Sequence, residues 1–163
     1  MQSAKGFVLK KIDVGEDAAL FLLYTRDFGK IRVIAQGVRK EKAKLRGHLE
    51  LLNLVNVQFV SAKNGMRATY ANLEEYWPNI RDNWRSYSLA RYMIELTDSV
   101  CFERDQNEAL WLLLLECFAA MNQKDFSDHV SLKSSFELRF SKGLGYTKKE
   151  DLNINLLDLL IKD

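Results

Sequence analysis

Basic side chains crowd the stretch from Tyr24 to Gly47, "YTRDFGKIRVIAQGVRKEKAKLRG", where eight Lys or Arg stand beside only two acids, Asp27 and Glu41. Like charges this close repel one another, and solubility does not require such a density. Lys and Arg bind phosphate oxygens, so this composition favours contact with a nucleic-acid backbone. A solvated loop that protects an edge strand is the alternative. The candidate contact residues are Arg26, Lys30, Arg32, Arg39, Lys40, Lys42, Lys44 and Arg46.

These charges form one binding surface only if the fold brings them together. Arg26 and Lys30 flank a predicted turn, Arg32 shares a strand face with Lys30, and the other five cations follow Gly37. The interpretation therefore requires the turn and the loop after Gly37 to be neighbours. Phe28, in the same turn, is a candidate for stacking on bases, a contact worth about 1–3 kcal/mol per base on a single strand.

Catalytic chemistry finds little support in the sequence. His48 and His129 have no metal-ligand spacing with a cysteine or with each other, and each is predicted to be an ordinary surface or turn histidine. Cys101 and Cys117 fall in apolar, helix-like segments, where a thiol is usually buried, and two cysteines are too few for a structural zinc site. "GLG" at 143–145 lacks the context of a phosphate-binding loop. We predict a protein that is not an enzyme and that carries no metal or other cofactor.

The two halves of the chain differ in net charge. Its 163 residues, 47% hydrophobic and 28% charged, suit one domain or two small ones. Residues 1–70 hold 13 Lys/Arg against 6 Asp/Glu, a net of +7, and residues 71–163 hold 11 against 16, a net of −5. No apolar run is long enough to cross a membrane, and the N-terminus lacks a signal-peptide segment. A cytoplasmic protein with reduced thiols is expected.

The front half reads as five short strands rich in Val, Ile, Leu and aromatic residues. This spacing suggests a small closed barrel, either the five-stranded oligonucleotide-binding (OB) barrel or an SH3-like barrel. Within the third strand, alternation places Ile31, Val33 and Ala35 on one face and Lys30 and Arg32 on the other. The five predicted strands cover residues 6–14, 18–25, 29–37, 50–60 and 65–73.

After Pro78, the only proline, the hydrophobic period becomes helical. Ile80 and Trp84 are expected on one face of the first helix, and the second is apolar almost all round, as in the centre of a bundle. We predict an α+β protein in which residues 1–77 form the barrel and 78–163 a helical domain. The four predicted helices cover residues 79–102, 108–121, 131–145 and 147–163.

Several motifs together resemble the RecO family of bacterial recombination mediators and DNA-repair proteins. They are "GED", "YTRDFGK", "AQGVRK" and "LRGHLEL" in the front half, then "RYMIELTDSV" and "FELRFSKGLGY". The resemblance spans roughly residues 6–146. It implies an OB barrel followed by a helical domain, and a protein that binds single- and double-stranded DNA, anneals complementary strands and helps to load a recombinase onto protein-coated single strands.

The resemblance also implies residue roles and partners. The basic residues named above, together with Phe28, stand in the family's DNA-facing region, with Lys10, Lys11 and Arg67 as secondary candidates. The implied protein partners are RecR, RecA and the acidic tail of the single-stranded-DNA-binding protein. Lys133 and Arg139 could form the basic rim of a pocket for that tail. The segment after "LGY" lacks the cysteines of the family's zinc-binding region, so zinc is not predicted.

Two other functions fit the same charge pattern. The basic loop could dock on an acidic protein partner, or the barrel could bind RNA, because OB barrels serve both nucleic acids.

Overall fold

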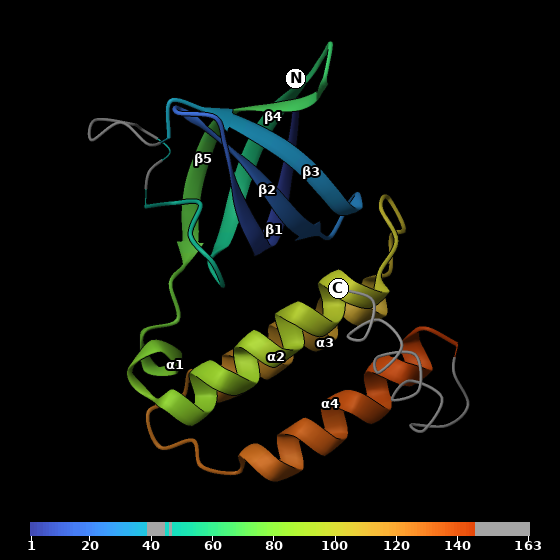
Figure 1. Cartoon of the computed structure of the whole chain (residues 1–163). Coiled ribbons are helices and arrows are strands. Elements are labelled where there is room, and N and C mark those ends of the chain that lie inside the picture. The colour runs from blue at the N-terminus through green and yellow to red at the C-terminus, as the bar shows by residue number, and fades with distance from the viewer. Residues whose placement is uncertain (39–44, 46, 146–163) are drawn as a thin grey trace. The chain divides into compact units, whose positions relative to one another are not determined.

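The computed structural model describes residues 1–38, 45 and 47–145, within which five strands precede four helices (Figure 1). The predicted α+β order is therefore confirmed. Contacts divide the chain into a barrel unit, residues 1–76 with 101–106, and a helical unit, residues 77–100 with the chain from 107 onward. The domain boundary predicted between residues 77 and 78 stays a prediction.

The strands close into a barrel in the order β1-β2-β3-β5-β4. All neighbours pair antiparallel except β3 and β5, which run parallel where Val33 meets Met66 and Ile34 meets Arg67. A five-stranded barrel of this order is the OB fold, which decides between the two barrels that the sequence left open. The strands are β1 (Gln2–Val14), β2 (Ala18–Thr25), β3 (Gly29–Gln36), β4 (Leu54–Ala62) and β5 (Gly65–Glu75).

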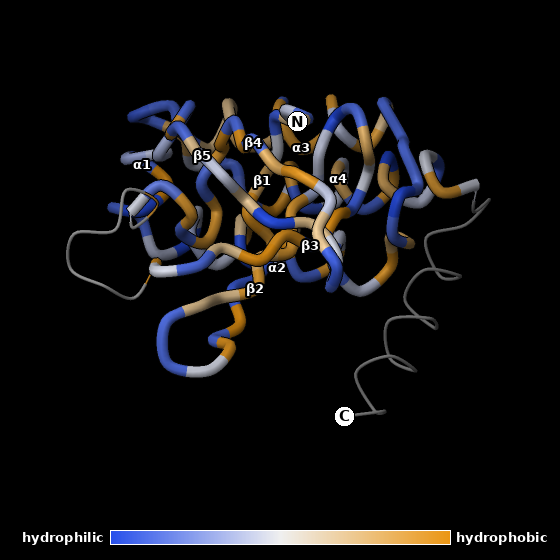
Figure 2. Tube along the Cα trace, turned by 90° about the horizontal axis from the view of Figure 1, so that it is seen from above, coloured by the Kyte–Doolittle hydropathy of each residue, from blue (hydrophilic) through white to orange (hydrophobic). Residues whose placement is uncertain are grey.

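Alternation along β3 sends Ile31, Val33 and Ala35 into the barrel, where each is at most 2% exposed, and leaves Arg32 outside. This is the predicted division of faces. Figure 2, which colours the Cα trace by hydropathy, shows both hydrophobic and hydrophilic residues along the barrel strands. The inward residues join Phe21 and Phe59 in one hydrophobic core. Burial of each large apolar side chain stabilises the folded barrel by about 1.5–3 kcal/mol.

Strand bounds differ from the prediction on either side of the third strand. The first strand begins four residues earlier than predicted, at Gln2, where it pairs with Phe59 of β4. The fourth begins at Leu54, because the chain before it turns through Leu52 at a φ of 73°. The buried Asn53 side chain fixes this turn by donating to the carbonyl of His48 at 2.9 Å.

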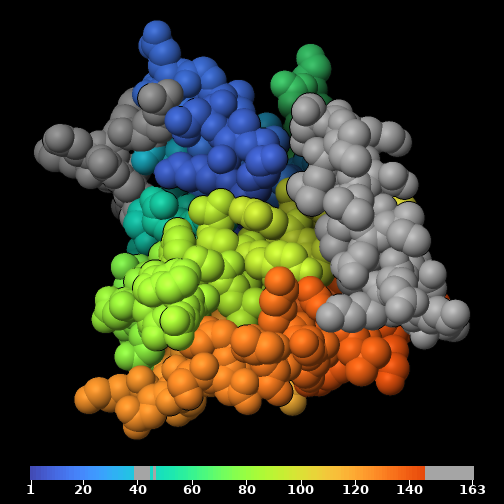
Figure 3. Space-filling view, turned by 60° about the horizontal axis from the view of Figure 1, so that its bottom comes forward, coloured from blue at the N-terminus to red at the C-terminus, as the bar shows by residue number. Residues whose placement is uncertain are grey.

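The helices are α1 (Pro78–Asp82), α2 (Trp84–Val100), α3 (Glu108–Met121) and α4 (His129–Gly143). Figure 3 shows α2 and α4 lying side by side on the surface of the helical unit. None of the helices in the described ranges is long and apolar enough to cross a membrane. The helix predicted over 147–163 lies outside the described residues.

The single helix predicted over 79–102 is wrong, because the chain breaks at Asn83. That residue is extended, with φ −117° and ψ 112°, and its side-chain oxygen accepts from the backbone N–H groups of Arg85 and Ser86. An Asn that caps these N–H groups starts a new helix. The break also leaves Trp84 73% exposed, whereas Ile80, predicted on the same helical face, is buried.

Gly29 closes the turn between β2 and β3 at a φ of 63°. A Cβ there would collide with the backbone carbonyl of Asp105. We expect Gly29→Ala to lower the free energy of unfolding by about 2 kcal/mol or more, since the left-handed backbone alone costs an L residue about 1–2 kcal/mol. Gly15 is the matched control, because its φ is 62° and a Cβ there meets nothing within 4 Å. Equal losses for both alanine variants in chemical denaturation would show that Asp105 exerts no steric constraint.

Candidate nucleic-acid interface

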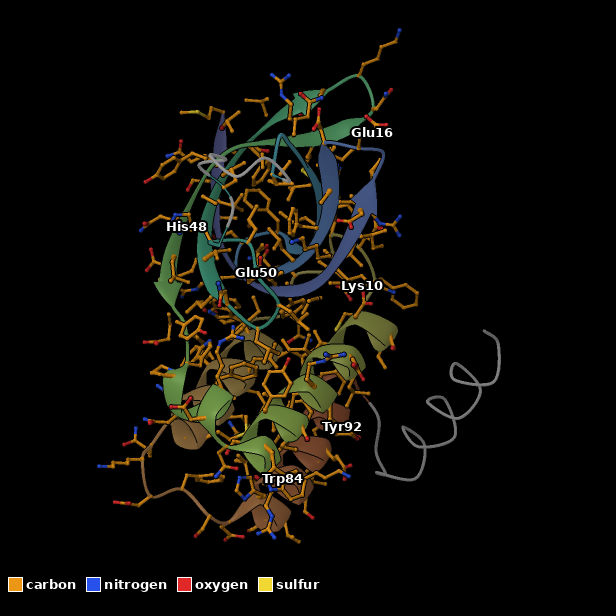
Figure 4. The ribbon with its side chains drawn as sticks, turned by 60° about the vertical axis from the view of Figure 1, so that its left-hand side comes forward. Lys10, Glu16, His48, Glu50, Trp84 and Tyr92 are labelled. Atoms are coloured by element: carbon orange, nitrogen blue, oxygen red, sulfur yellow. The ribbon has the colours of Figure 1, made fainter. Side chains whose placement is uncertain are left out.

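Rows of side chains cross the outer face of the barrel, because residues paired in register point to the same side of a sheet. One row joins Lys10 of β1, Leu22 of β2 and Arg32 of β3. Strands lie about 4.8 Å apart, so Lys10 and Arg32 stand roughly 10 Å from each other. Figure 4 shows Lys10 on the outside of the barrel. Lys10, a secondary candidate for DNA contact, thus lies on the same face of the sheet as Arg32, a primary candidate.

The adjoining row is apolar at its centre and basic at one end. Ile12, Leu20 and Ile34 follow one another across β1, β2 and β3, and Arg67 of β5 lies beside Ile34. Ile12 is 40% exposed, so this apolar surface is open to solvent. The face of β2 and β3 is where OB barrels bind oligonucleotides, together with the β1–β2 and β4–β5 connections.

Two hollows open along β3. The first, of about 340 Å³, has Lys30, Arg32 and Ile34 on one side and Asn64 of the β4–β5 turn on the other. The second, of about 360 Å³, lies at the end of the barrel over Phe28. Each is at the lower end of the roughly 300–1,000 Å³ typical of ligand sites. The hollows therefore lie where the fold predicts a strand-binding surface.

Glu103 is the acidic member of this surface. Its carboxylate forms an ion pair with the Nε of Arg32, and both side chains are largely exposed. The neighbouring Arg104 lines both hollows, and its backbone N–H donates to the carbonyl of Lys30 at 2.8 Å. Sequence reasoning missed both residues. They follow a helical segment some 70 positions after β3, and no local pattern marks them as part of the barrel.

Phe28 is half-buried and its ring meets Phe59 edge to face, with centroids 5.7 Å apart. It packs against the barrel core. The turn that carries it is fixed by the buried Thr25, whose Oγ1 donates to the carbonyl of Gly29 at 2.9 Å and accepts from the N–H of Phe28. Phe28 thus closes one end of the barrel, and stacking on bases stays a prediction. Tyr24 is fully buried, and this burial raises the pKa of its phenol.

The predicted basic residues separate into two groups along β3. Arg26 is exposed in the turn before this strand, whereas the segment after Gly37 leaves from its other end. Eight residues at about 3.3 Å each place the two ends roughly 26 Å apart. The structure thus does not bring the turn and Gly37 together. The remaining predicted cations, Arg39, Lys40, Lys42, Lys44 and Arg46, lie outside the described residues.

Two described residues next to the basic side chains pack in the barrel. Val38 is 5% exposed and belongs to the hydrophobic core, and Leu45 packs against that core. Lys11, a secondary candidate, pairs instead with Glu50 at 3.5 Å, so part of its charge is already neutralised. The exposed pair is worth at most about 1 kcal/mol in stability.

Lys133 and Arg139 occupy different surroundings in the helical unit. Lys133 stands over the ring of Tyr92, 4.8 Å from its centroid, and lines a mainly apolar hollow of about 290 Å³ with Leu89 and Val130. Arg139 forms an ion pair with Glu116 of α3 and does not line this hollow. The Tyr92 hydroxyl donates to Glu137 at 2.8 Å. Burial, and after it this hydrogen bond, raises the pKa of the phenol.

A serine–histidine pair with catalytic spacing joins two helices of the helical unit. The Oγ of Ser86 lies 2.8 Å from Nε2 of His129, the separation of a nucleophile and its base. Ser86 is only 1% exposed, so the contact fastens α2 to α4. Cys117 and Cys101 are both buried, although Cys101 follows α2 and is not inside it. Burial raises the pKa of Cys117 to about 11. The described residues include no group of three potential metal ligands.

Comparison with known proteins decides the family. Residues 1–73 match the family model "Recombination protein O N terminal", and residues 81–148 match "Recombination protein O C terminal". The chain belongs to the RecO family. The resemblance found in the sequence motifs is thereby confirmed. The RecO N-terminal match covers β1 to β4 and most of β5, and the C-terminal match covers most of the helical unit.

Similar curated proteins carry the RecO name. The chain is 30% identical over 142 residues to the DNA repair protein RecO of Moorella thermoacetica and 31% identical over 142 residues to that of Dehalococcoides mccartyi strain CBDB1. These alignments cover 87% of this chain but 52% and 55% of those RecO proteins. The RecO of Pelotomaculum thermopropionicum is 28% identical, with 56% of its length covered. The chain thus spans about half the length of the RecO relatives that it matches.

Proposed function

We propose that the protein acts in the bacterial cytoplasm as a DNA-repair mediator that binds single- and double-stranded DNA and anneals complementary strands. The observation that carries this proposal is the open apolar surface of Leu20 and Ile34 on the β2–β3 face, bordered by Arg32 and Arg67. The cations suit phosphates and the apolar side chains suit bases. Membership of the RecO family and the names of the relatives support the same role.

Annealing of this kind uses no fuel. Two strands repel each other through their phosphates, and a basic surface that holds both reduces this repulsion. Base pairing then drives formation of the duplex. The mechanism needs no nucleophile or metal.

The test measures annealing of complementary oligonucleotides across a salt series, with fluorescence quenching as the readout. We expect the protein to accelerate annealing at about 50 mM salt and to lose affinity by several orders of magnitude near 200 mM, if about six phosphates are contacted. Repeating the assay on strands coated with single-stranded-DNA-binding protein tests the mediator role. Binding that is insensitive to salt, or a strong preference for RNA of the same sequence, would contradict the proposal.

The hollow beside Lys133 supports a second activity, the docking of an acidic peptide. Its apolar lining from Leu89, Tyr92 and Val130 suits a hydrophobic side chain, and the ammonium of Lys133 suits a carboxylate. The acidic tail of the single-stranded-DNA-binding protein has this chemistry by family resemblance. Recombinase loading and contact with RecR and RecA are proposed on the resemblance alone.

A further inference from the structure

The segment Cys101–Gln106 belongs to the barrel unit although it lies between two helices in the sequence. It runs along the first half of β3, where Lys30 and Glu103 form a parallel bridge. Strand β5 pairs with β3 only at Val33 and Ile34, so this segment occupies the part of the β3 edge that β5 leaves unpaired. The barrel surface beside Lys30 and Arg32 is thus built from two distant stretches of the chain.

Arg104 lines both hollows. The hollows also share Ile31 and Met66, so they are neighbours. Together they extend from Asn64 in the β4–β5 turn to Phe28 at the end of the barrel, and we treat them as one groove. Arg104 holds a φ of 59°, a left-handed backbone that is uncommon outside glycine and asparagine. Its position is therefore fixed by the fold, while its side chain is exposed.

We propose that Cys101–Gln106 completes a groove for a single nucleic-acid strand, with Arg104 as a phosphate contact and Glu103 as an internal competitor for Arg32. The inference rests on the proposed function and identifies the preferred substrate of that site. The apolar side chains of Leu20 and Ile34 suit base faces, which a single strand exposes and a duplex hides. Lys30, Arg32 and Arg104 supply the positive charge that a phosphate backbone requires.

Glu103 takes the place that a phosphate would occupy. A carboxylate and a phosphate both accept hydrogen bonds from guanidinium, so Glu103 competes with a bound strand for Arg32. Asp27, which also lines the groove, adds negative charge near Phe28. Removing the Glu103 charge should therefore release Arg32 and raise affinity, an effect opposite to that of removing Arg104.

The experiment compares Glu103→Gln with Glu74→Gln in binding to a fluorescent oligothymidylate and to a duplex of equal length. Glu74 is the matched control, because it pairs with Lys5 at 3.1 Å on the same barrel but lines neither hollow. Both variants change the net charge by +1. We expect Glu103→Gln to tighten single-strand binding several-fold more than Glu74→Gln does. Equal effects of the two variants would overturn the role of Glu103.

Arg104→Asn tests the phosphate contact without straining the turn, because Asn tolerates a positive φ. We expect affinity for the oligothymidylate to fall by about tenfold and the salt slope by about 0.7, the value for one single-strand contact. Arg104→Lys should restore most of the affinity, and Lys5→Ala should change it little. An Arg104→Asn variant that binds single strands normally, or that weakens duplex binding equally, would overturn the groove assignment.

These outcomes are separate from failure of the proposed function. If the unaltered protein binds neither oligothymidylate nor duplex at 50 mM salt, the proposed function itself fails. If it binds both, but the Arg104 and Glu103 variants behave like their controls, the protein is a DNA-binding protein and this groove is not its binding site. Thermal denaturation of each variant verifies that it is folded.

Discussion

Reversing Lys40, Lys42, Lys44 and Arg46 to Glu is expected to abolish measurable DNA binding at physiological salt. Four lost contacts should lower the single-strand salt slope by about three, since each contributes about 0.7. Repulsion from the four new carboxylates weakens binding further. We expect stability to change little, on the hypothesis that these side chains lie in solvent, where a charge contributes at most about 1 kcal/mol. The measurement is fluorescence anisotropy of labelled oligonucleotides from 50 to 200 mM salt.

The matched control reverses an equal number of cations in the helical unit. These are Arg81, Arg85, Lys124 and Lys142. Both variants change the net charge by −8, so a general loss of attraction to DNA would affect them equally. A large loss in the first variant and a small loss in the second would assign binding to the basic segment. A folded first variant with normal DNA affinity would refute that assignment.

Phe59→Ala is expected to lower the free energy of unfolding of the barrel by about 3–5 kcal/mol, the usual cost of deleting a buried phenyl ring. Phe59 is 1% exposed, and its neighbour Phe28 would lose its aromatic contact. Because folded domains are stable by only about 5–15 kcal/mol, this loss should reduce DNA binding at temperatures that the unaltered protein withstands. The same truncation in the helical unit, Phe136→Ala, is the control, since Phe136 is fully buried.

Tryptophan fluorescence can separate the two effects. Trp77, Trp84 and Trp111 all belong to the helical unit, so their emission reports the unfolding of that unit alone. If the two units unfold independently, Phe136→Ala shifts the fluorescence transition and Phe59→Ala does not. Circular dichroism should then show the Phe59→Ala shift as an earlier, separate transition. One common transition for both variants would contradict a division into independent domains.

Local periodicity was sufficient to predict most of the secondary structure. Alternation in β3 marked its buried face, since a strand with one side in a core must repeat every second residue. The same reasoning failed at Asn83, because a helix cap depends on one side-chain contact and the apolar spacing continued on both sides of it. The position of Trp84 followed from that break and not from its hydrophobicity.

The sequence by itself determined the strand-then-helix order, the basic character of the first 70 residues and the RecO resemblance. Each of these depends on composition or on short-range spacing. Only the tertiary structure placed Arg104 and Glu103 beside Arg32, and only it separated Arg26 from Gly37 by the length of β3. Side chains distant in sequence become neighbours through strand pairing and chain return, and that pairing is decided by the packing of the whole barrel.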